Sequence, residues 1–139
     1  MKEKIFVDTG AFLALLDASD PYHASAGEVF GNFHNSGAEL CTIDYVLDEL
    51  FTIMRCTRRL PVERVLAFAN NIELADIEVF GISKDVFKDA LKLMVKYSDQ
   101  YFSMTDCVSF IVMKDLKIKK TLTTDKHFTI AGFNNLLWR

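Results

Sequence analysis

Two aspartates stand where a folded chain could use them for chemistry. Asp8 follows the apolar run KIFV and Asp125 follows KKTLTT, so both are expected at the carboxyl ends of strands. In an open α/β sheet, binding and catalytic sites form outside these ends. Each residue alone has an ordinary alternative, a helix cap for Asp8 and a turn residue for Asp125. Their shared position at strand ends favours a functional role.

Glu49 is a third candidate, on a helix predicted to start at Asp44. Stepping 100° per residue places Glu49 at the margin of the apolar stripe, near Val46 and Ile53. The same stepping places Asp48 on the polar side, as a solvated charge. A carboxylate turned toward the edge of a core is costly unless it is paired or holds a cation. Glu49 is therefore the stronger candidate of the two.

Asp106 is the fourth candidate and lies in the first turn of an otherwise apolar helix. It could simply stabilise the helix dipole, with Ser103 as the cap, an effect worth about 0.3–1 kcal/mol. The hydroxyl groups of Ser103 and Thr105 are also of the kind that orient acids or bound waters. Both interpretations stay open at this point.

Three or four converging carboxylates repel one another unless a cation lies between them. Oxygen ligands suit Mg²⁺ or Mn²⁺, whereas Zn²⁺ prefers histidine and cysteine. The three histidines, His23, His34 and His127, show no spacing typical of metal ligands, and the most we expect of His127 is a phosphate contact. The predicted cofactor is Mg²⁺ or Mn²⁺, which activates water against phosphodiesters.

Basic residues near these acids could hold the phosphate backbone of a nucleic acid. The candidates are Arg55, Arg58 and Arg59 in RCTRR, and Lys126 after Asp125. A second basic group, before the last long strand, consists of Lys114, Lys117, Lys119 and Lys120. A solvated surface explains any one of them equally well. The chain has no Gly-rich phosphate loop, nucleophile elbow or dinucleotide fingerprint.

The composition predicts one globular domain spanning residues 1–139, in which half of the residues are hydrophobic. A net charge of −3 does not suggest a generic nucleic-acid binder, although it does not exclude local basic patches. Cys41, Cys56 and Cys107 have no C-x-x-C spacing and are expected to be small buried hydrophobes in a reducing cytoplasm. The apolar segments are shorter than the roughly 20 residues of a membrane span, so we expect a soluble protein.

Strands and helices alternate along the chain. Strands are expected at 4–8, 38–43, 76–82 and 119–125, with a short one at 134–138. Helices are expected at 10–18, 21–33, 44–58, 61–74, 84–97 and 103–116. Asp20 with Pro21 is expected to start the second helix, and Ser83 to cap the fifth. This alternation predicts an α/β fold around a largely parallel sheet and argues against the all-β aspartic proteases that VDTGA would otherwise suggest.

The chain resembles the PIN-domain nucleases, in particular the VapC-type toxins of prokaryotic toxin–antitoxin pairs. The resemblance covers nearly the whole length and is carried by FVDTGAFLALLDASDPYH, YVLDEL, FSMTDCVSFIVMKDL and TLTTDKHF. It implies a three-layer α/β/α sandwich with four or five strands, a homodimer, and an antitoxin segment in the active-site groove. It also implies an acidic metal-binding set with two supporting hydroxyl residues: Asp8, Glu49, Asp106 and Asp125, with Thr9 and Thr105.

From this resemblance we expect a Mg²⁺- or Mn²⁺-dependent endoribonuclease, the toxin of a type II toxin–antitoxin pair. The three aspartates, with Glu49 bound directly or through water, would hold one or two cations for in-line attack of water on RNA phosphodiesters. Three alternatives stay open: a PIN nuclease of RNA processing or decay without an antitoxin, a non-catalytic module that binds RNA or protein, and a phosphatase with Asp8 as nucleophile. The phosphatase lacks its usual second aspartate, since Gly10 stands there.

Overall fold

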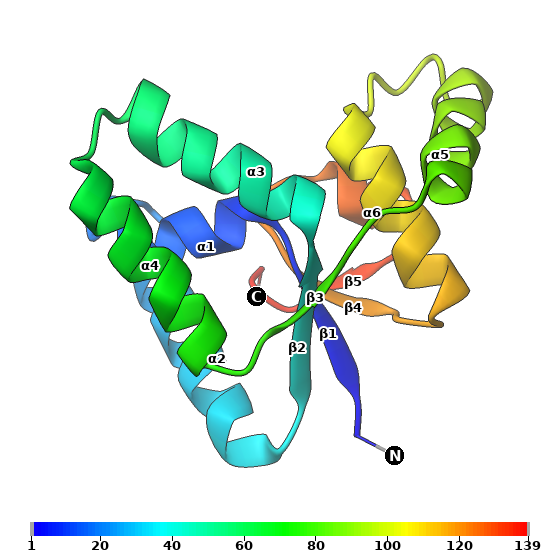
Figure 1. The fold of residues 1–139 in the computed structure, drawn as a ribbon. Coiled ribbons are helices and arrows are strands. Elements are labelled where there is room, and N and C mark those ends of the chain that lie inside the picture. The colour runs from blue at the N-terminus through cyan, green and yellow to red at the C-terminus, as the bar shows by residue number, and fades with distance from the viewer. Residues whose placement is uncertain (1, 139) are drawn as a thin grey trace.

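A five-stranded parallel sheet forms the centre of the computed structural model, which describes residues 2–138 (Figure 1). Its strands are β1 (Lys4–Val7), β2 (Glu39–Ile43), β3 (Glu78–Phe80), β4 (Lys120–Leu122) and β5 (Asn134–Asn135). They are ordered β3-β2-β1-β4-β5, and each neighbouring pair is parallel. The predicted α/β fold is confirmed, including the short fifth strand.

Helices cover both sides of the sheet and complete a three-layer sandwich (Figure 1). On one side lie α1 (Thr9–Leu16), α2 (His23–Ser36), α3 (Asp44–Thr52) and α4 (Val62–Leu74). On the other side lie α5 (Lys84–Lys96), α6 (Met104–Asp115) and α7 (His127–Ile130). The end of α3 continues into η1 (Ile53–Thr57), a short π-helix.

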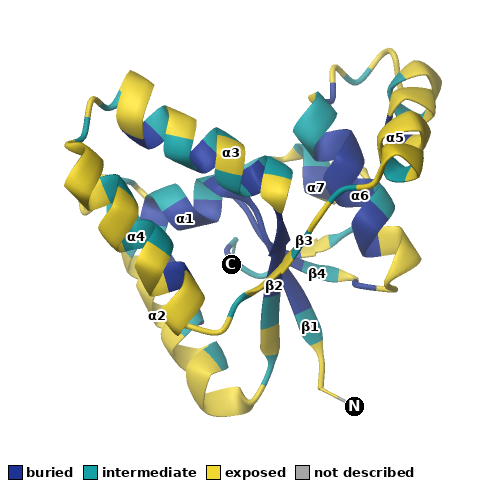
Figure 2. Cartoon of the chain, in the orientation of Figure 1, coloured by how far each residue is buried: buried dark blue, intermediate teal, exposed yellow. Residues whose placement is uncertain are grey.

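The central strand and α6 carry much of the core. Ile5, Phe6 and Val7 are fully buried, as expected for a parallel sheet covered on both faces. Seven of the twelve residues of α6 are buried, which confirms the prediction of a helix apolar nearly all round (Figure 2). Phe128 of α7 contacts the rings of both Phe6 and Phe110, so α7 is packed firmly between the sheet and α6.

Two local predictions are wrong, and one short helix was missed. The second helix starts at His23, because the Asp20 side chain accepts a hydrogen bond from the Tyr22 N–H and closes a turn instead of capping. Cys56 is exposed, because it lies in η1, where Met54 takes the buried position. Helix α7 was not predicted, since a single turn is too short to show a helical period. The predicted Ser83 cap is confirmed by its hydrogen bond from Val86.

The helices are short, and α2 is the longest at 14 residues. Within residues 2–138, none combines the length and the apolar character that crossing a membrane requires.

Candidate metal centre

The carboxyl ends of β1 and β4 lie side by side in the middle of the sheet. From β1 the chain continues to β2 on one side, and it later adds β4 on the other side of β1. The gap between the ends of β1 and β4 is therefore the topological switch point of the sheet. Ligands of open α/β sheets bind in the crevice at such a point. Asp8 follows β1 directly, and Asp125 lies three residues beyond the end of β4. The structure therefore brings both predicted aspartates to the same edge.

Thr123 joins these two strand ends. Its hydroxyl donates a hydrogen bond to Asp8 Oδ2 at 2.8 Å and accepts one from the Asp125 N–H at 2.9 Å. The Thr123 N–H and carbonyl are both bonded to the side-chain amide of Asn135 on β5. This network, in which Asp8, Thr123 and Asn135 are buried, fixes the Asp8 carboxylate relative to the loop that carries Asp125.

Asp8 is a buried carboxyl group in a field of negative charge. Its pKa is raised from the ordinary value of 3.8 to about 7, chiefly because burial disfavours the charged form. Hydrogen bonds from Thr123 and from the Thr9 N–H oppose the rise, and the charges of Asp106 and Glu49 add to it. Asp106 and Glu49 thus lie close enough to Asp8 for their charges to raise its pKa.

Asp106 is held at the start of α6 by a capping box. Its Oδ2 accepts a hydrogen bond from the Ser103 N–H at 3.1 Å, while Ser103 Oγ accepts one from the Asp106 N–H at 3.0 Å. Asp106 is only 6% exposed, and burial raises its pKa, with a further rise from the charge of Asp125. The capping role and the role in the acidic cluster are therefore compatible, since the cap orients the carboxylate.

Glu49 approaches the cluster from α3. It is half-buried, whereas Asp48 is exposed, as helical stepping predicted. The Thr105 hydroxyl donates a hydrogen bond to Glu49, which opposes the rise in the pKa of Glu49 caused mainly by burial. The charges of Asp106 and Asp125 raise this pKa further. All four predicted acids therefore share one electrostatic environment.

His127 also faces the acids, and the sequence did not predict this. Its Nδ1 lies 3.0 Å from Asp106 Oδ2 and 3.3 Å from Asp125 Oδ1. One ligand atom from each of these three residues lies within 4.8 Å of the other two, a spacing that could hold a metal ion. The linear spacing of the histidines gave no sign of this cluster, because contacts across the fold do not show in linear spacing.

The donor set fits a divalent cation. Carboxyl groups whose pKa values are raised by burial and mutual repulsion are stabilised in their charged form by a nearby positive charge. Asp8 and Asp106 are in this condition. Next to Asp8, the Thr9 hydroxyl is buried and makes no hydrogen bond within residues 2–138. It is a further oxygen available to a bound water or ligand.

The three predicted arginines lie at the far end of α3 and η1, beyond Glu49. Arg55 Nη1 donates a hydrogen bond to the Leu60 carbonyl, and Arg58 forms an ion pair with Asp17. Arg59 follows in a left-handed backbone conformation, with a φ of 53°. At 1.5 Å per residue, Arg58 lies about 13 Å along the helix from Glu49. These side chains are therefore at some distance from the acids.

The predicted lysines lie at two different ends of the sheet. Lys126 is exposed and precedes α7, directly after Asp125. Lys120 is aligned with Ile5 in the sheet and pairs with Glu3, so it lies toward the amino ends of the strands. The neighbouring lysines of the second basic group precede it in sequence and are exposed. Of the lysines considered, Lys126 is thus the one placed beside an acid of the cluster.

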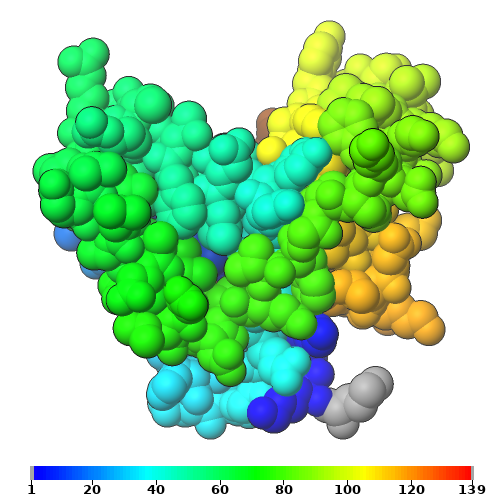
Figure 3. All heavy atoms as spheres, in the orientation of Figure 1, coloured from blue at the N-terminus to red at the C-terminus, as the bar shows by residue number. Residues whose placement is uncertain are grey.

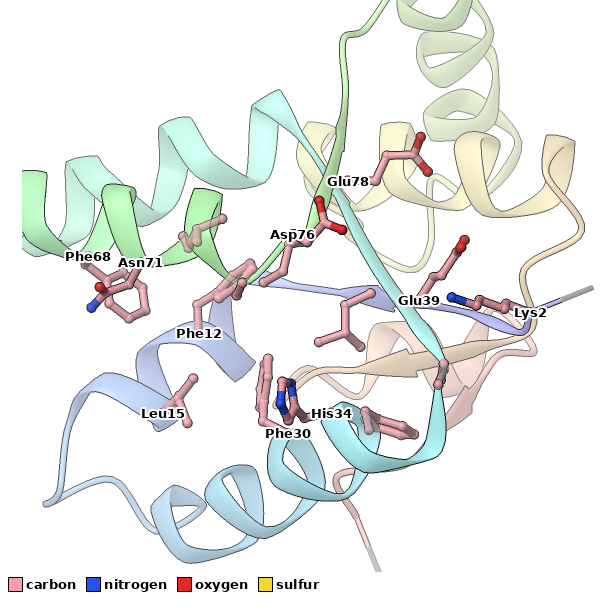
Figure 4. A pocket seen from close by; sticks show the side chains of 17 residues that line it. Lys2, Phe12, Leu15, Phe30, His34, Glu39, Phe68, Asn71, Asp76 and Glu78 are labelled. Carbon is pink, nitrogen blue, oxygen red and sulfur yellow. The ribbon is translucent and has the colours of Figure 1, made fainter.

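Two hollows of the molecule bear on where a ligand could bind. A notch opens between the α3 side and the α5–α6 side of the molecule (Figure 3). A separate cavity of about 900 Å³ lies between α1, α2 and α4, with Phe12, Phe30 and Phe68 in its wall (Figure 4). Glu39, Asp76 and Glu78 lie along one side of it. None of the four clustered acids lines this cavity, so the cavity and the acidic centre are different surfaces.

Comparison with known proteins gives matches over most of the chain. A family model described as PIN domain matches residues 5–134. The 23S rRNA-specific endonuclease VapC20 of Mycobacterium tuberculosis is 28% identical over 131 residues, which cover 93% of this chain and 95% of the relative. Ribonuclease VapC26 of the same organism is 26% identical over 126 residues, 90% of each chain. A VapC ribonuclease of Archaeoglobus fulgidus is 27% identical over 139 residues, covering 96% and 84%.

Solved structures agree with this similarity. The crystal structure of Mycobacterium tuberculosis VapC20, described as a sarcin–ricin loop-cleaving toxin, matches with a TM-score of 0.81 and 27% identity over 93% of this chain and 95% of that one. A toxin–antitoxin complex from Klebsiella pneumoniae matches with a TM-score of 0.59 and 11% identity, over 88% and 87%. The second likeness concerns the fold alone.

Proposed function

Because this chain belongs to the PIN-domain family, we propose that it is a divalent-metal-dependent endoribonuclease formed by one domain, residues 1–139. The observation that carries the proposal is the cluster of four acids at the switch point of the sheet, where buried carboxyl groups raise one another's pKa values. Relatives that cover most of the chain are named as ribonucleases, which supports RNA as the substrate.

Each residue of the cluster has a role in this proposal. Asp8, Asp106 and Asp125 hold Mg²⁺ or Mn²⁺, and Glu49 does so directly or through water. When bound, the ion supplies activation of water and stabilisation of charge on phosphoryl oxygens. The two threonines that donate hydrogen bonds to the acids, Thr105 and Thr123, keep the carboxylates oriented. The buried hydroxyl of Thr9 orients a water or a phosphate oxygen.

Positive side chains that follow the acids in sequence or lie beyond them on α3 and η1 would bind the RNA backbone. Lys126 is the first candidate because it is exposed and adjacent to Asp125. Arg55 and Arg59 lie further along the α3 side and would contact nucleotides away from the cut. Arg58 is the weakest candidate, since its charge is already paired with Asp17.

We further propose that the protein is the toxin of a type II pair, acting in the cytoplasm as a homodimer and inhibited by an antitoxin protein. The support is the similarity to VapC20, whose structure is described as that of a toxin. An adjacent small gene encoding a DNA-binding protein would favour this role. Without such a gene, a PIN nuclease of RNA processing or decay becomes the better assignment.

RNA cleavage by matched variants tests the enzymatic proposal. Wild type, Asp8→Asn and Asp44→Asn are incubated with a mixed cellular RNA pool that contains ribosomal RNA, with Mg²⁺ or Mn²⁺ and with EDTA. Asp44 is the matched control because it also stands at the carboxyl end of a strand, but its carboxylate accepts a hydrogen bond from Ile82 outside the cluster. All three proteins are first shown to be folded and free of co-purified inhibitor.

Discrete cleavage by wild type and Asp44→Asn, lost in Asp8→Asn and in EDTA, is the expected result. Equal cutting by Asp8→Asn would contradict the assignment and point to another active centre. If none of the folded proteins cuts RNA, a non-catalytic binding module, or a nuclease with a very narrow substrate range, becomes the better assignment.

A further inference from the structure

His127 is the one member of the close three-residue cluster that the proposed nuclease mechanism leaves without a role. Its Nδ1 faces Asp106 Oδ2 and Asp125 Oδ1 at 3.0 and 3.3 Å. Adjacent ligands of an octahedral ion with bonds of about 2.1 Å lie about 3.0 Å apart. The nitrogen is thus spaced from the two carboxylate oxygens as a neighbouring ligand would be.

The imidazole is held in this direction from several sides. Its ring packs edge to face with Phe102 at 5.1 Å, and Phe102 is nearly buried against Phe110. The backbone N–H of His127 donates a hydrogen bond to Asp125 Oδ1 at 2.9 Å, which fixes the start of α7 next to the acid. Since ring and backbone are both anchored, the nitrogen already faces the carboxylates and little rotamer freedom would be lost on binding an ion.

We propose, building on the nuclease assignment, that His127 Nδ1 is a ligand of the same ion as Asp106 and Asp125, and that it makes the site prefer Mn²⁺ to Mg²⁺. Mg²⁺ favours oxygen ligands and keeps its waters, whereas imidazole nitrogen binds divalent transition metals more readily. As a ligand, the neutral imidazole carries its proton on Nε2. A purely positioning role, in which Nδ1–H only donates a hydrogen bond to Asp106, is the competing explanation.

His127→Asn separates these two roles. An asparagine amide can place an N–H near the position of Nδ1 and keep the hydrogen bond to Asp106, but it cannot supply an imidazole nitrogen to a metal. His34→Asn is the matched control, because His34 is exposed on α2 and lines the apolar cavity instead of the acidic centre. Thermal melts establish that both variants are folded.

The direct readout is electron spin-echo modulation of the full-length protein loaded with Mn²⁺. Modulation from a directly bound ¹⁴N is expected for wild type and His34→Asn, and its loss for His127→Asn. Absence of ¹⁴N modulation in wild type would overturn the proposal, even if His127→Asn does not fold. This measurement needs no RNA. The assignment of His127 as a ligand can therefore hold even if the protein does not cleave RNA, and the nuclease proposal can hold even if the ¹⁴N modulation is absent.

Calorimetric titration with Mn²⁺ and then with Mg²⁺ measures the preference. We expect His127→Asn to bind Mn²⁺ about tenfold more weakly than wild type, with a smaller change for Mg²⁺, so that the preference shrinks. His34→Asn should retain the wild-type preference. An equal loss for both ions in His127→Asn would instead assign the residue to positioning Asp106.

Discussion

Asp8→Asn should stabilise the metal-free protein, and should do so more strongly as the pH rises. Asp8 ionises with a pKa of about 7 in the folded protein, against an ordinary 3.8 in the unfolded chain. Between these values the folded protein keeps a proton that the unfolded chain releases. The contribution of Asp8 to stability is therefore fully present below about pH 4 and is lost as the pH rises through 7.

The size of the effect follows from the same two values. Ionising Asp8 in the folded protein, relative to the unfolded chain, costs about 4 kcal/mol, at 1.36 kcal/mol for each pKa unit. Asparagine has nearly the same shape, can still accept the hydrogen bond from Thr123, and never ionises. The loss of the acceptor for the Thr9 N–H adds a penalty that does not vary with pH. The free-energy difference between Asp8→Asn and wild type should therefore grow by up to about 4 kcal/mol from pH 4 to pH 8.

Urea unfolding in EDTA, at constant ionic strength and at each pH unit from 4 to 8, measures this difference. Asp44→Asn, whose carboxylate lies outside the cluster, should follow wild type across the series. Some pH dependence should remain in Asp8→Asn, because burial also raises the pKa values of Glu49 and Asp106. A difference that stays constant between pH 4 and pH 8 would refute the reasoning, since Asp8 would then titrate as an ordinary surface acid. Saturating Mn²⁺ should shrink the advantage of Asp8→Asn, because it adds about 2.7 kcal/mol to the stability of wild type at 100 times its Kd.

Three further predictions concern the support of the site. Ser103→Ala should lose about 1 kcal/mol in urea unfolding and bind Mn²⁺ more weakly, because the Asp106 N–H loses its acceptor and the start of α6 is held less firmly, whereas Ser83→Ala should lose stability alone. Gly10→Ala should weaken Mn²⁺ binding, since its Cβ would lie 2.0 Å from Thr124 Oγ1 and 3.2 Å from the Thr124 nitrogen, while Gly27→Ala, with nothing within 4 Å, should not. In hydrogen exchange, α4 amides should exchange faster than those of α6, because α4 buries one residue beside a cavity and α6 buries seven. Equal Mn²⁺ affinities of Ser103→Ala and Ser83→Ala, or of Gly10→Ala and Gly27→Ala, would contradict the first two expectations. Equal amide exchange rates in α4 and α6 would contradict the third.

The sequence predicted those acids whose position follows from local pattern. Asp8 could be placed because a buried strand is a short apolar run, and the residue after it lies at the carboxyl edge of a parallel sheet. Glu49 and Asp48 could be separated because helical period alone decides which of two neighbours faces inward. Ser83 and Ser103 could be read as caps, since capping depends on residues three apart.

The parts that were missed depend on contacts between distant segments. Thr123 connects Asp8 to Asp125 only because β4 pairs with β1, more than a hundred residues away in sequence. Asn135 supports Thr123 through the pairing of a two-residue strand. His127 reaches Asp106 through a four-residue helix that has no readable period. The nearest signal for it was its spacing of two residues from Asp125.

The central claim is that Asp8, Asp106 and Asp125 together bind a divalent ion at one site. Anomalous diffraction from Mn²⁺-soaked crystals tests this claim most directly. Data collected at the manganese absorption edge locate bound Mn²⁺ without reference to activity. We expect an anomalous peak in contact with carboxylates of this set at the carboxyl ends of β1 and β4, and we expect it to be weakened or absent in Asp8→Asn. No peak there at saturating Mn²⁺, or a peak unchanged by Asp8→Asn, would contradict it.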